Sequence, residues 1–219
     1  MLARGARPQE IGRPDSRLEF PARSGMQWLI MAAIAYQIIT WSWVLFIVYW
    51  SINAFRVKAV AEHQSWAESL SYRLPATVGG ALLWVQASPR PLQTVITPHN
   101  YAVRLTGAVL CVAGLGTAIW ARRTLAGNWS SNVTFKQGHE LVKTGPYRFA
   151  RHPIYTGLLL MVLGTALAGA RLHSWLGAGL LFISFWIKLK AEEVVMLRHF
   201  PDQYPAYRNE VKAIVPFIL

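Results

Sequence analysis

Long, almost unbroken apolar runs constrain this chain more than any other feature of its sequence. The longest run, Met26–Trp50, holds 25 residues and contains few polar side chains besides Gln27 and Gln37. At a helical rise of about 1.5 Å per residue, a run of this length exceeds the ~30 Å thickness of the hydrocarbon core of a bilayer. The run therefore predicts a membrane-spanning helix.

Four further apolar runs extend the pattern. We expect spanning helices at Tyr72–Ala87, Tyr101–Ala121, Ile154–Ala170 and Leu172–Leu189. Because the last two meet at Arg171, they should form a tight antiparallel hairpin. The prediction is an all-α, polytopic integral membrane protein with about five transmembrane helices and a C-terminal helical hairpin.

The runs divide the chain into three regions. Residues 1–25 carry five Arg and little apolar content, which predicts a disordered basic tail rather than a signal peptide. Residues 26–121 hold the N-terminal transmembrane helices, and the mixed stretch Ser51–Ser71 between the first two predicts a short interfacial helix or a solvated connector. Residues 122–219 hold the polar motifs and end in an amphipathic segment that we expect to return over them.

Small residues recur along the Tyr101–Ala121 run. Gly107, Cys111, Gly114 and Gly116 predict a face on which another helix can approach closely. Cys111 is the chain's only cysteine, so it excludes a disulfide or a cysteine metal site within one chain.

The charge is strongly positive, with 22 Lys and Arg against 10 Asp and Glu, a formal net charge of +12. The basic residues lie at the ends of apolar runs and not in one continuous stripe, so we expect a lipid bilayer as partner and no nucleic acid. Six Lys and Arg fall in residues 122–151 and five in residues 188–212. The positive-inside tendency predicts that this end of the hairpin lies on the cytoplasmic face.

A polar stretch, His139–Gly157, interrupts the apolar pattern and contains two His, two Tyr and two Arg. So many hydrogen-bonding groups at a bilayer boundary are costly unless something polar binds there, which indicates a functional site. The predicted hairpin brings this stretch beside the acidic pair Glu192-Glu193.

Arg151-His152-Pro153 should open the fourth helix, because proline is well tolerated at a first helical position. The helix N-terminus offers unpaired N–H groups and a partial positive charge, which favour an anionic group such as the carboxylate of an amino-acid-like cofactor. Glu192, across the hairpin, could accept hydrogen bonds from that cofactor's ammonium group or ribose hydroxyls.

Structural alternatives exist for each residue of the polar stretch. The arginines suit snorkelling anchors, His152 a helix cap, the tyrosines an interfacial belt, and the two glutamates a solvated helix end. A zinc site built from His139, His152 and the glutamates is the competing chemical interpretation. We expect no metal, since neither an HxxxH nor an HExxH spacing is present.

These motifs together resemble the signature of a known family. The residues that carry the resemblance are His139-Glu-Leu-Val142, Gly145-Pro-Tyr147, Arg151-His-Pro-Ile-Tyr155-Thr-Gly157, and Glu192-Glu193 followed by Phe200 and Tyr204-Pro-Ala-Tyr207. They look like those of the isoprenylcysteine carboxyl methyltransferases, which belong with the phospholipid N-methyltransferases in a membrane-embedded group that uses S-adenosylmethionine. The resemblance covers roughly Asn128–Pro216.

The resemblance implies roles for individual positions. The adenosine part of S-adenosylmethionine would lie against His139, Glu140, Leu141, Val142 and Tyr147, and its methionine part against His152, Pro153, Ile154 and Tyr155, with Glu192 at the amino end. The implied catalytic residues are Glu192, Lys188 and Arg151. Lys188 stands where the carboxyl methyltransferases have a substrate-facing arginine, and lysine keeps the charge but not the bidentate fork.

The predicted function is methyl transfer from S-adenosylmethionine to a carboxylate of a lipophilic, isoprenylcysteine-like acceptor, with S-adenosylhomocysteine as product. Within the same class, the acceptor could instead be a small thiol or a phospholipid amine. From other classes, we considered an NADPH-dependent sterol-type reductase, which we expect to be much longer, and a non-enzymatic membrane scaffold, which would bind no small cofactor.

Overall fold

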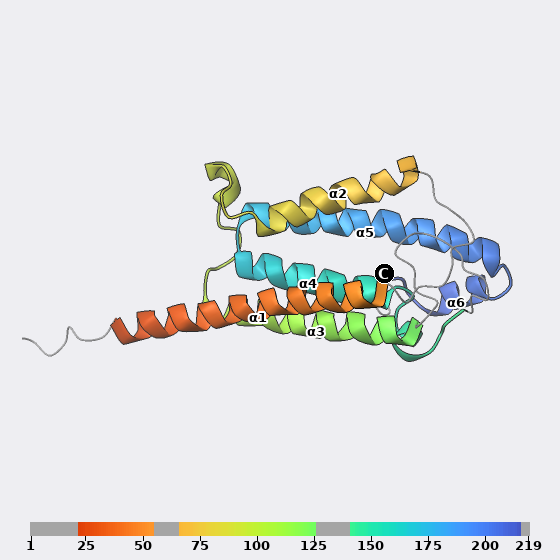
Figure 1. The fold of residues 1–219 in the computed structure, drawn as a ribbon, viewed down its shortest axis with the longest axis horizontal. Coiled ribbons are helices and arrows are strands. Elements are labelled where there is room, and N and C mark those ends of the chain that lie inside the picture. The colour runs from red at the N-terminus through yellow and green to blue at the C-terminus, as the bar shows by residue number, and fades with distance from the viewer. Residues whose placement is uncertain (1–21, 55–65, 126–140, 216–219) are drawn as a thin grey trace, which may run out of the picture.

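The computed structural model describes residues 22–54, 66–125 and 141–215. Within these ranges the regular elements are all helices (Figure 1). One isolated bridge pairs Val95 with Arg171. In chain order the elements are α1 (Ala22–Ala54), α2 (Trp66–Trp84), the 3-10 turn η1 (Arg90–Gln93), α3 (Tyr101–Leu125), the 3-10 turn η3 (Gly145–Arg148), α4 (Pro153–Gly169), α5 (Leu172–His199) and α6 (Tyr204–Glu210). The predicted all-α class is confirmed for the described residues.

Two of these helices are long and apolar enough to cross a membrane, namely Ile30–Asn53 within α1 and Tyr101–Leu125, which is α3. The helix α4 is also apolar but shorter, at 17 residues. The long helices lie side by side, roughly parallel or antiparallel to one another (Figure 1). Their arrangement and apolar composition suggest a membrane protein.

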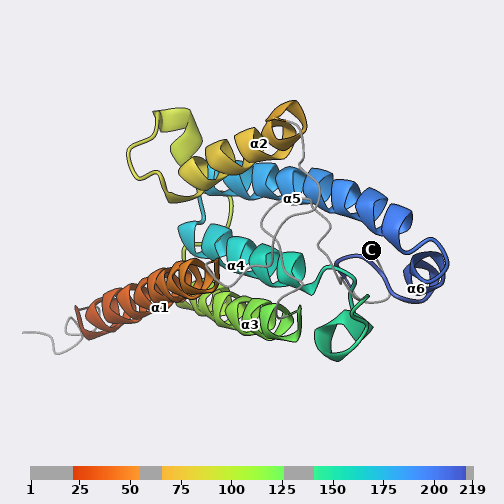
Figure 2. The same ribbon diagram turned by 45° about the vertical axis from the view of Figure 1, so that its right-hand side comes forward.

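The helices α4 and α5 are joined by only Ala170 and Arg171 and run in opposite directions (Figures 1 and 2). Ala170 adopts a left-handed conformation, φ 58°, which ends α4. The backbone of residues 94–97 holds this turn, since Ile96 N donates to Ala170 O over 2.8 Å and Leu172 N donates to Thr94 O over 2.8 Å. The start of α4 and the end of α5 therefore lie at the same end of the molecule.

The predicted small-residue face of α3 packs against α4. A Cβ built on Gly107 would collide with the carbonyl oxygen of Gly164, and one on Gly114 with that of Gly157. Cys111, between them, is fully buried. Gly116 was included in this face wrongly, because it points into open space. Glycine therefore sets the distance between α3 and α4, which fixes where the N-terminus of α4 lies.

Substituting alanine at Gly164 should separate α3 from α4. The new methyl group meets backbone on Gly107 and Cys111, which cannot move aside as a flexible side chain would. We expect a loss of about 1–3 kcal/mol in the free energy of unfolding, measured by denaturation in detergent. Gly116→Ala is the matched control, and it should leave stability unchanged or slightly higher. Equal stability of the two variants would contradict this packing.

The helix α1 packs on α3 and α4 through a mixed apolar and polar contact. Trp43 Nε1 donates to Thr165 Oγ1 over 2.9 Å, and Tyr36 OH donates to the backbone oxygen of Ala168 over 3.0 Å. Ile39, between these two residues, is 1% exposed. Trp41 lies on the outer side and is 60% exposed, as expected for a lipid-facing residue.

Several predicted boundaries are corrected. The interfacial helix predicted for residues 51–71 is wrong at both ends, since residues 51–54 continue α1 and residues 66–71 begin α2, while 55–65 lie outside the described residues. Because α2 starts at Trp66, Pro75 lies inside it rather than in its first turn. The helix α5 continues to His199, ten residues beyond the predicted end at Leu189, because charge ends an apolar run without ending a helix. Residues 1–21 of the predicted basic tail lie outside the described residues, and its last four residues, 22–25, belong to α1 instead.

Candidate functional site

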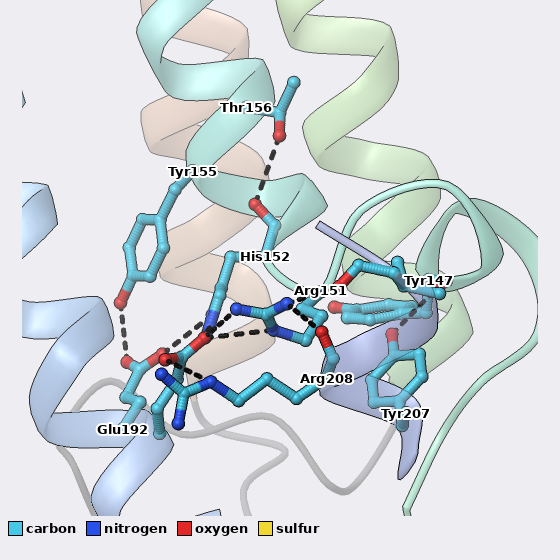
Figure 3. A network of polar contacts seen from close by, with 10 residues as sticks. Tyr147, Arg151, His152, Tyr155, Thr156, Glu192, Tyr207 and Arg208 are labelled. Carbon is cyan, nitrogen blue, oxygen red and sulfur yellow. Dashed lines mark hydrogen bonds and ion pairs between the residues drawn. The ribbon is translucent and has the colours of Figure 1, made fainter. Parts of the chain in front are cut away.

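A buried ion pair joins the start of α4 to the end of α5. Arg151 Nε and Nη2 lie 3.0 Å and 2.5 Å from Glu193 Oε1 (Figure 3). Both side chains are almost inaccessible to solvent, at 7% and 4% exposure. Such a pair is held in place by the neighbours that satisfy its remaining hydrogen-bonding groups.

The C-terminal segment supplies those neighbours. Arg151 Nη1 donates to the backbone oxygens of Arg208, at 3.1 Å, and of Val211. The backbone N–H groups of Arg151 and His152 donate to Lys212 O and Ala213 O over 2.8 Å and 2.9 Å. The chain after α6 is thus tied to the N-terminus of α4, and the predicted return of this segment over the polar stretch is confirmed in the described residues.

His152 lies between the two glutamates. Its Nδ1 is 3.6 Å from Glu192 Oε2 and its Nε2 is 3.6 Å from Glu193 Oε1. These distances allow charge attraction but exceed an ordinary hydrogen bond. Nε2 is buried and has no hydrogen-bond partner among the described residues. The imidazole also stacks on Tyr155, with ring centroids 5.7 Å apart.

Glu192 faces a different neighbourhood from Glu193. Tyr155 OH donates to Glu192 Oε1 over 2.5 Å, and the Glu192 side chain keeps 24% exposure (Figure 3). One turn earlier, Lys188 Nζ lies over the rings of Tyr155 and Tyr72, 5.9 Å and 5.6 Å from their centroids. A partly exposed carboxylate, an ammonium group and two aromatic rings therefore border one region beside α2, α4 and α5.

Tyr147 and Tyr207 secure the turn that precedes α4. Tyr207 OH donates to Tyr147 O over 2.5 Å, and both tyrosines are buried. Burial, reinforced by the negative charge of Glu192, raises the pKa of the Tyr147 phenol well above its usual value. Gly145 begins this turn with φ +59°, a conformation that favours glycine.

Electrostatic coupling follows from this arrangement. Burial would raise the pKa of Glu193, but His152 and Arg151 outweigh it and hold that pKa at about 2. Burial likewise opposes the charge of Glu192, yet His152 and Lys188 lower its pKa below the usual 4.5. Burial would lower the pKa of His152, and the two carboxylates raise it above 6.5 instead. The site thus favours two carboxylates and an imidazolium at mildly acidic pH.

The stability of the fold should therefore pass through a maximum with pH. The contribution of Glu193 is complete above pH 4.5 and is lost as the pH falls toward its folded pKa of about 2. The contribution of His152 is complete below pH 6.5 and is lost as the pH rises through its higher folded pKa. Thermal melting from acid to alkaline pH tests this, with His152→Gln as comparison. Parallel alkaline limbs for the parent and the variant would contradict the role of His152.

The structure brings together most of the predicted site. Arg151, His152, Tyr155 and Glu192 meet at one place, Lys188 borders it, and Pro153 and Ile154 form the first turn of α4. Leu141 and Val142 are half-buried and lie in the chain just before η3, apart from the residues that meet at this place. His139 and Glu140 lie outside the described residues.

Three contributors were missed from the sequence. Tyr72 was assigned only to a spanning helix, and the carbonyl oxygens of Val211 and Ile214 carry no side-chain signal at all. Thr156 Oγ1 donates to Ile214 O over 2.7 Å, which adds another tie to the C-terminal segment. The alternation of apolar and polar residues near Ala213 was the available signal, since Ala213 and Ile214 are buried against Tyr155 and Leu189.

Comparison with known proteins relates the region of the site to a methyltransferase family. Residues 103–203 match the family model described as phospholipid methyltransferase. The match covers 101 of the chain's 219 residues and shows what this region is similar to. The matched region includes α4, α5 and both members of the Arg151–Glu193 ion pair. The predicted resemblance is confirmed.

Individual relatives agree with this assignment. The chain is 31% identical over 118 residues to the protein-S-isoprenylcysteine O-methyltransferase of Saccharomyces cerevisiae, covering 51% of this chain and 48% of that protein. It is 35% identical over 81 residues to the enzyme of the same name from Schizosaccharomyces pombe, covering 36% and 34%. It is also 26% identical over 157 residues to the nickel-cobalt-cadmium resistance protein NccN of Alcaligenes xylosoxydans xylosoxydans, covering 59% and 70%. The chain spans about half the length, or less, of the two fungal relatives.

The name of one relative refers to resistance to metal ions. Within residues 22–54, 66–125 and 141–215, no group of three or more His, Cys, Asp or Glu side chains is placed to hold a metal ion. The Glu193 carboxylate of the described site is also engaged in an ion pair with Arg151.

Proposed function

We propose that this protein is an integral-membrane methyltransferase that uses S-adenosylmethionine and methylates the carboxylate of a lipophilic, isoprenylcysteine-like acceptor. The observation that carries the proposal is the Glu192 carboxylate, partly exposed and held by Tyr155 and His152 within the part of the chain that matches the phospholipid methyltransferase family model. A scaffold protein would have no need of this arrangement.

The described residues fit an amino-acid-like cofactor. Glu192 is anionic and retains free surface, as the partner of an ammonium group requires. The buried Nε2 of His152 lacks a hydrogen-bond partner in the described part of the chain. The first N–H groups of α4, at Ile154 and Tyr155, have no partner within a helix and suit a carboxylate. We assign the methionine part to these residues and the adenosine part to Leu141, Val142 and Tyr147, with His139 and Glu140 preceding them.

Bound S-adenosylmethionine supplies a methyl group on a positively charged sulfur. The protein's part is to bind, orient and desolvate, because an acceptor carboxylate is already ionised at neutral pH and needs no base. Arg151 ties the start of α4 to α5 through Glu193 and to the C-terminal segment through two carbonyl oxygens, and so positions His152 and Tyr155 rather than reacting. Lys188 lies one turn before Glu192 on α5, and its Nζ lies over the Tyr72 ring, where it could attract the acceptor carboxylate.

The proposed topology has five spans, with α4 and α5 as a hairpin whose open ends face the cytoplasm. The apolar lengths of α1 and α3 support spanning, and the antiparallel course of α4 and α5 supports a shared polar end. The basic residues of 122–151 and 188–212 support a cytoplasmic placement. A soluble cofactor would then enter from the cytoplasm, and a lipophilic acceptor from the bilayer.

Methyl transfer to a prenylated cysteine tests the proposal. Purified protein is incubated with S-adenosylmethionine labelled at its methyl group and with an N-acylated S-prenylcysteine. We expect label that base releases as methanol, since only a methyl ester is cleaved in this way. Parallel incubations with phosphatidylethanolamine and with a small thiol test an amine and a thiol acceptor, whose label would be stable to base. Transfer to one of these alone, or to none of the three acceptors, would contradict the assignment.

Lys188 has a matched control two residues away. Lys188→Met should raise the KM for the carboxylate acceptor about tenfold, the loss expected for one charged contact. Lys190→Met removes the same charge from the opposite face of α5, 200° around the helix, and should leave that KM unchanged. Equal KM values for the two variants would remove Lys188 from acceptor binding.

A further inference from the structure

A basic cavity lies on the other side of α5 from Lys188 and Glu192. It encloses about 450 Å³ and is bordered by Trp186, Lys190, Arg208, Asn209 and Lys212, with Arg151 as its inner wall. Trp186 and Lys190 stand two residues from Lys188, and two residues turn a helix by about 200°. The cavity is therefore distinct from the region proposed for the methyl donor and acceptor.

The lining of the cavity carries an excess of positive charge. Four of its lining residues are cationic, and no acidic residue lines it among the described residues. Glu193 is paired with Arg151 and lies 3.9 Å from Arg208 Nε, so the excess positive charge comes mainly from Lys190 and Lys212. Arg208 is 45% exposed, and Lys190 Nζ lies over the Trp186 ring at 4.7 Å from its centroid. Cations gathered in this way repel one another unless an anion lies among them.

An apolar surface continues from the cavity along α5. Phe182, one turn before Trp186, stacks on it with ring centroids 6.1 Å apart. Phe182 and Ile183 are 41% and 50% exposed. The same side of the helix is thus apolar within the predicted span, aromatic at its end and basic just beyond, the order in which a bilayer presents acyl chains, interface and phosphate.

We propose that this cavity binds the phosphate of an anionic membrane phospholipid, whose acyl chain lies along Phe182 and Ile183. Lys190, Arg208 and Lys212 contact the phosphate, Asn209 donates to it or to the glycerol, and Trp186 marks the level of the interface. Because Arg151, Arg208, Lys212 and Ala213 line the cavity, a bound lipid also steadies the segment tied to the N-terminus of α4.

Lipid retention tests this directly. The full chain, purified in detergent, is exposed to an equal mixture of phosphatidylglycerol and phosphatidylcholine, and the lipids that remain bound are measured by mass spectrometry. We expect the parent to retain phosphatidylglycerol preferentially. The double variant Lys190→Gln with Lys212→Gln should lower that preference by about fivefold for each lysine removed. The double variant Arg90→Gln with Arg171→Gln removes the same charge from the opposite end of the helices and should keep the parent's preference.

Two further measurements separate the sources of the anion and guard against misfolding. Inorganic phosphate should fail to displace phosphatidylglycerol, and displacement at equal concentration would show a free-phosphate site and overturn the lipid assignment. Phosphatidylglycerol with a photoreactive acyl chain should label the α5 peptide that contains Phe182 and Ile183 in the unmodified protein. Labelling confined to other helices, or an unchanged preference in the lysine variant, would overturn the proposal whether or not the protein binds S-adenosylhomocysteine.

Discussion

Replacing Glu193 by glutamine should destabilise the folded protein by about 3–5 kcal/mol, the usual cost of leaving one member of a buried ion pair without its partner. The amide would leave the positive charge of Arg151 uncompensated at a position where both side chains are almost fully buried. His152 would lose one of its two carboxylates as well. The free energy of unfolding, measured by denaturation in detergent, should show this loss.

Glu210→Gln is the matched control, because Glu210 is an exposed carboxylate on α6. Its effect should stay within about 0.5 kcal/mol. The pair Arg151→Met with Glu193→Leu should recover only part of the loss, since the carbonyl oxygens of Arg208 and Val211 would remain without their donor. A Glu193→Gln protein as stable as the control would contradict the structural role of this pair.

Replacing Glu192 by glutamine should have the opposite signature. Its side chain keeps 24% exposure and Tyr155 can still donate to the amide oxygen, so stability should change little. The affinity for S-adenosylhomocysteine should fall about ten- to hundredfold, because the ligand's ammonium group loses a charged hydrogen-bond partner. Isothermal titration of the variant and the parent, both confirmed folded by melting, measures this difference.

Glu192 and Glu193 are expected to have different phenotypes because consecutive residues of a helix point about 100° apart. Two equal losses of affinity without a loss of stability would mean that both carboxylates serve the ligand. A dominant loss of affinity in Glu193→Gln would mean that the assignment is shifted by one residue.

Apolar run length predicted the helical class because hydrophobicity is read directly from consecutive residues. It misplaced helix ends, as at α5, because Lys190 and the following residues are good helix formers that lie beyond the apolar run. The glycines of α3 were read correctly at Gly107 and Gly114 but not at Gly116, whose orientation depends on where α4 lies. A single sequence does not contain that relation.

The site was predictable where side chains carried the signal. The expected antiparallel course of α4 and α5 placed the motif around His152 beside the acidic pair Glu192-Glu193. The choice of Glu193 as partner of Arg151 and the use of backbone oxygens at Arg208 and Val211 were not predictable, because they depend on how residues 204–214 pack. The basic cavity beside Trp186 was hidden for the same reason, since its cations come from three separate segments.

The most direct test of the central claim is a titration of the purified, folded protein with S-adenosylhomocysteine and, separately, with NADPH. The proposed methyltransferase should bind S-adenosylhomocysteine saturably at one site per chain and show no saturable binding of NADPH. Its affinity for S-adenosylhomocysteine should fall when Glu192 is changed to glutamine. Saturable binding of NADPH alone would indicate a reductase, and binding of neither would indicate a protein without this catalytic function; either result would contradict the account.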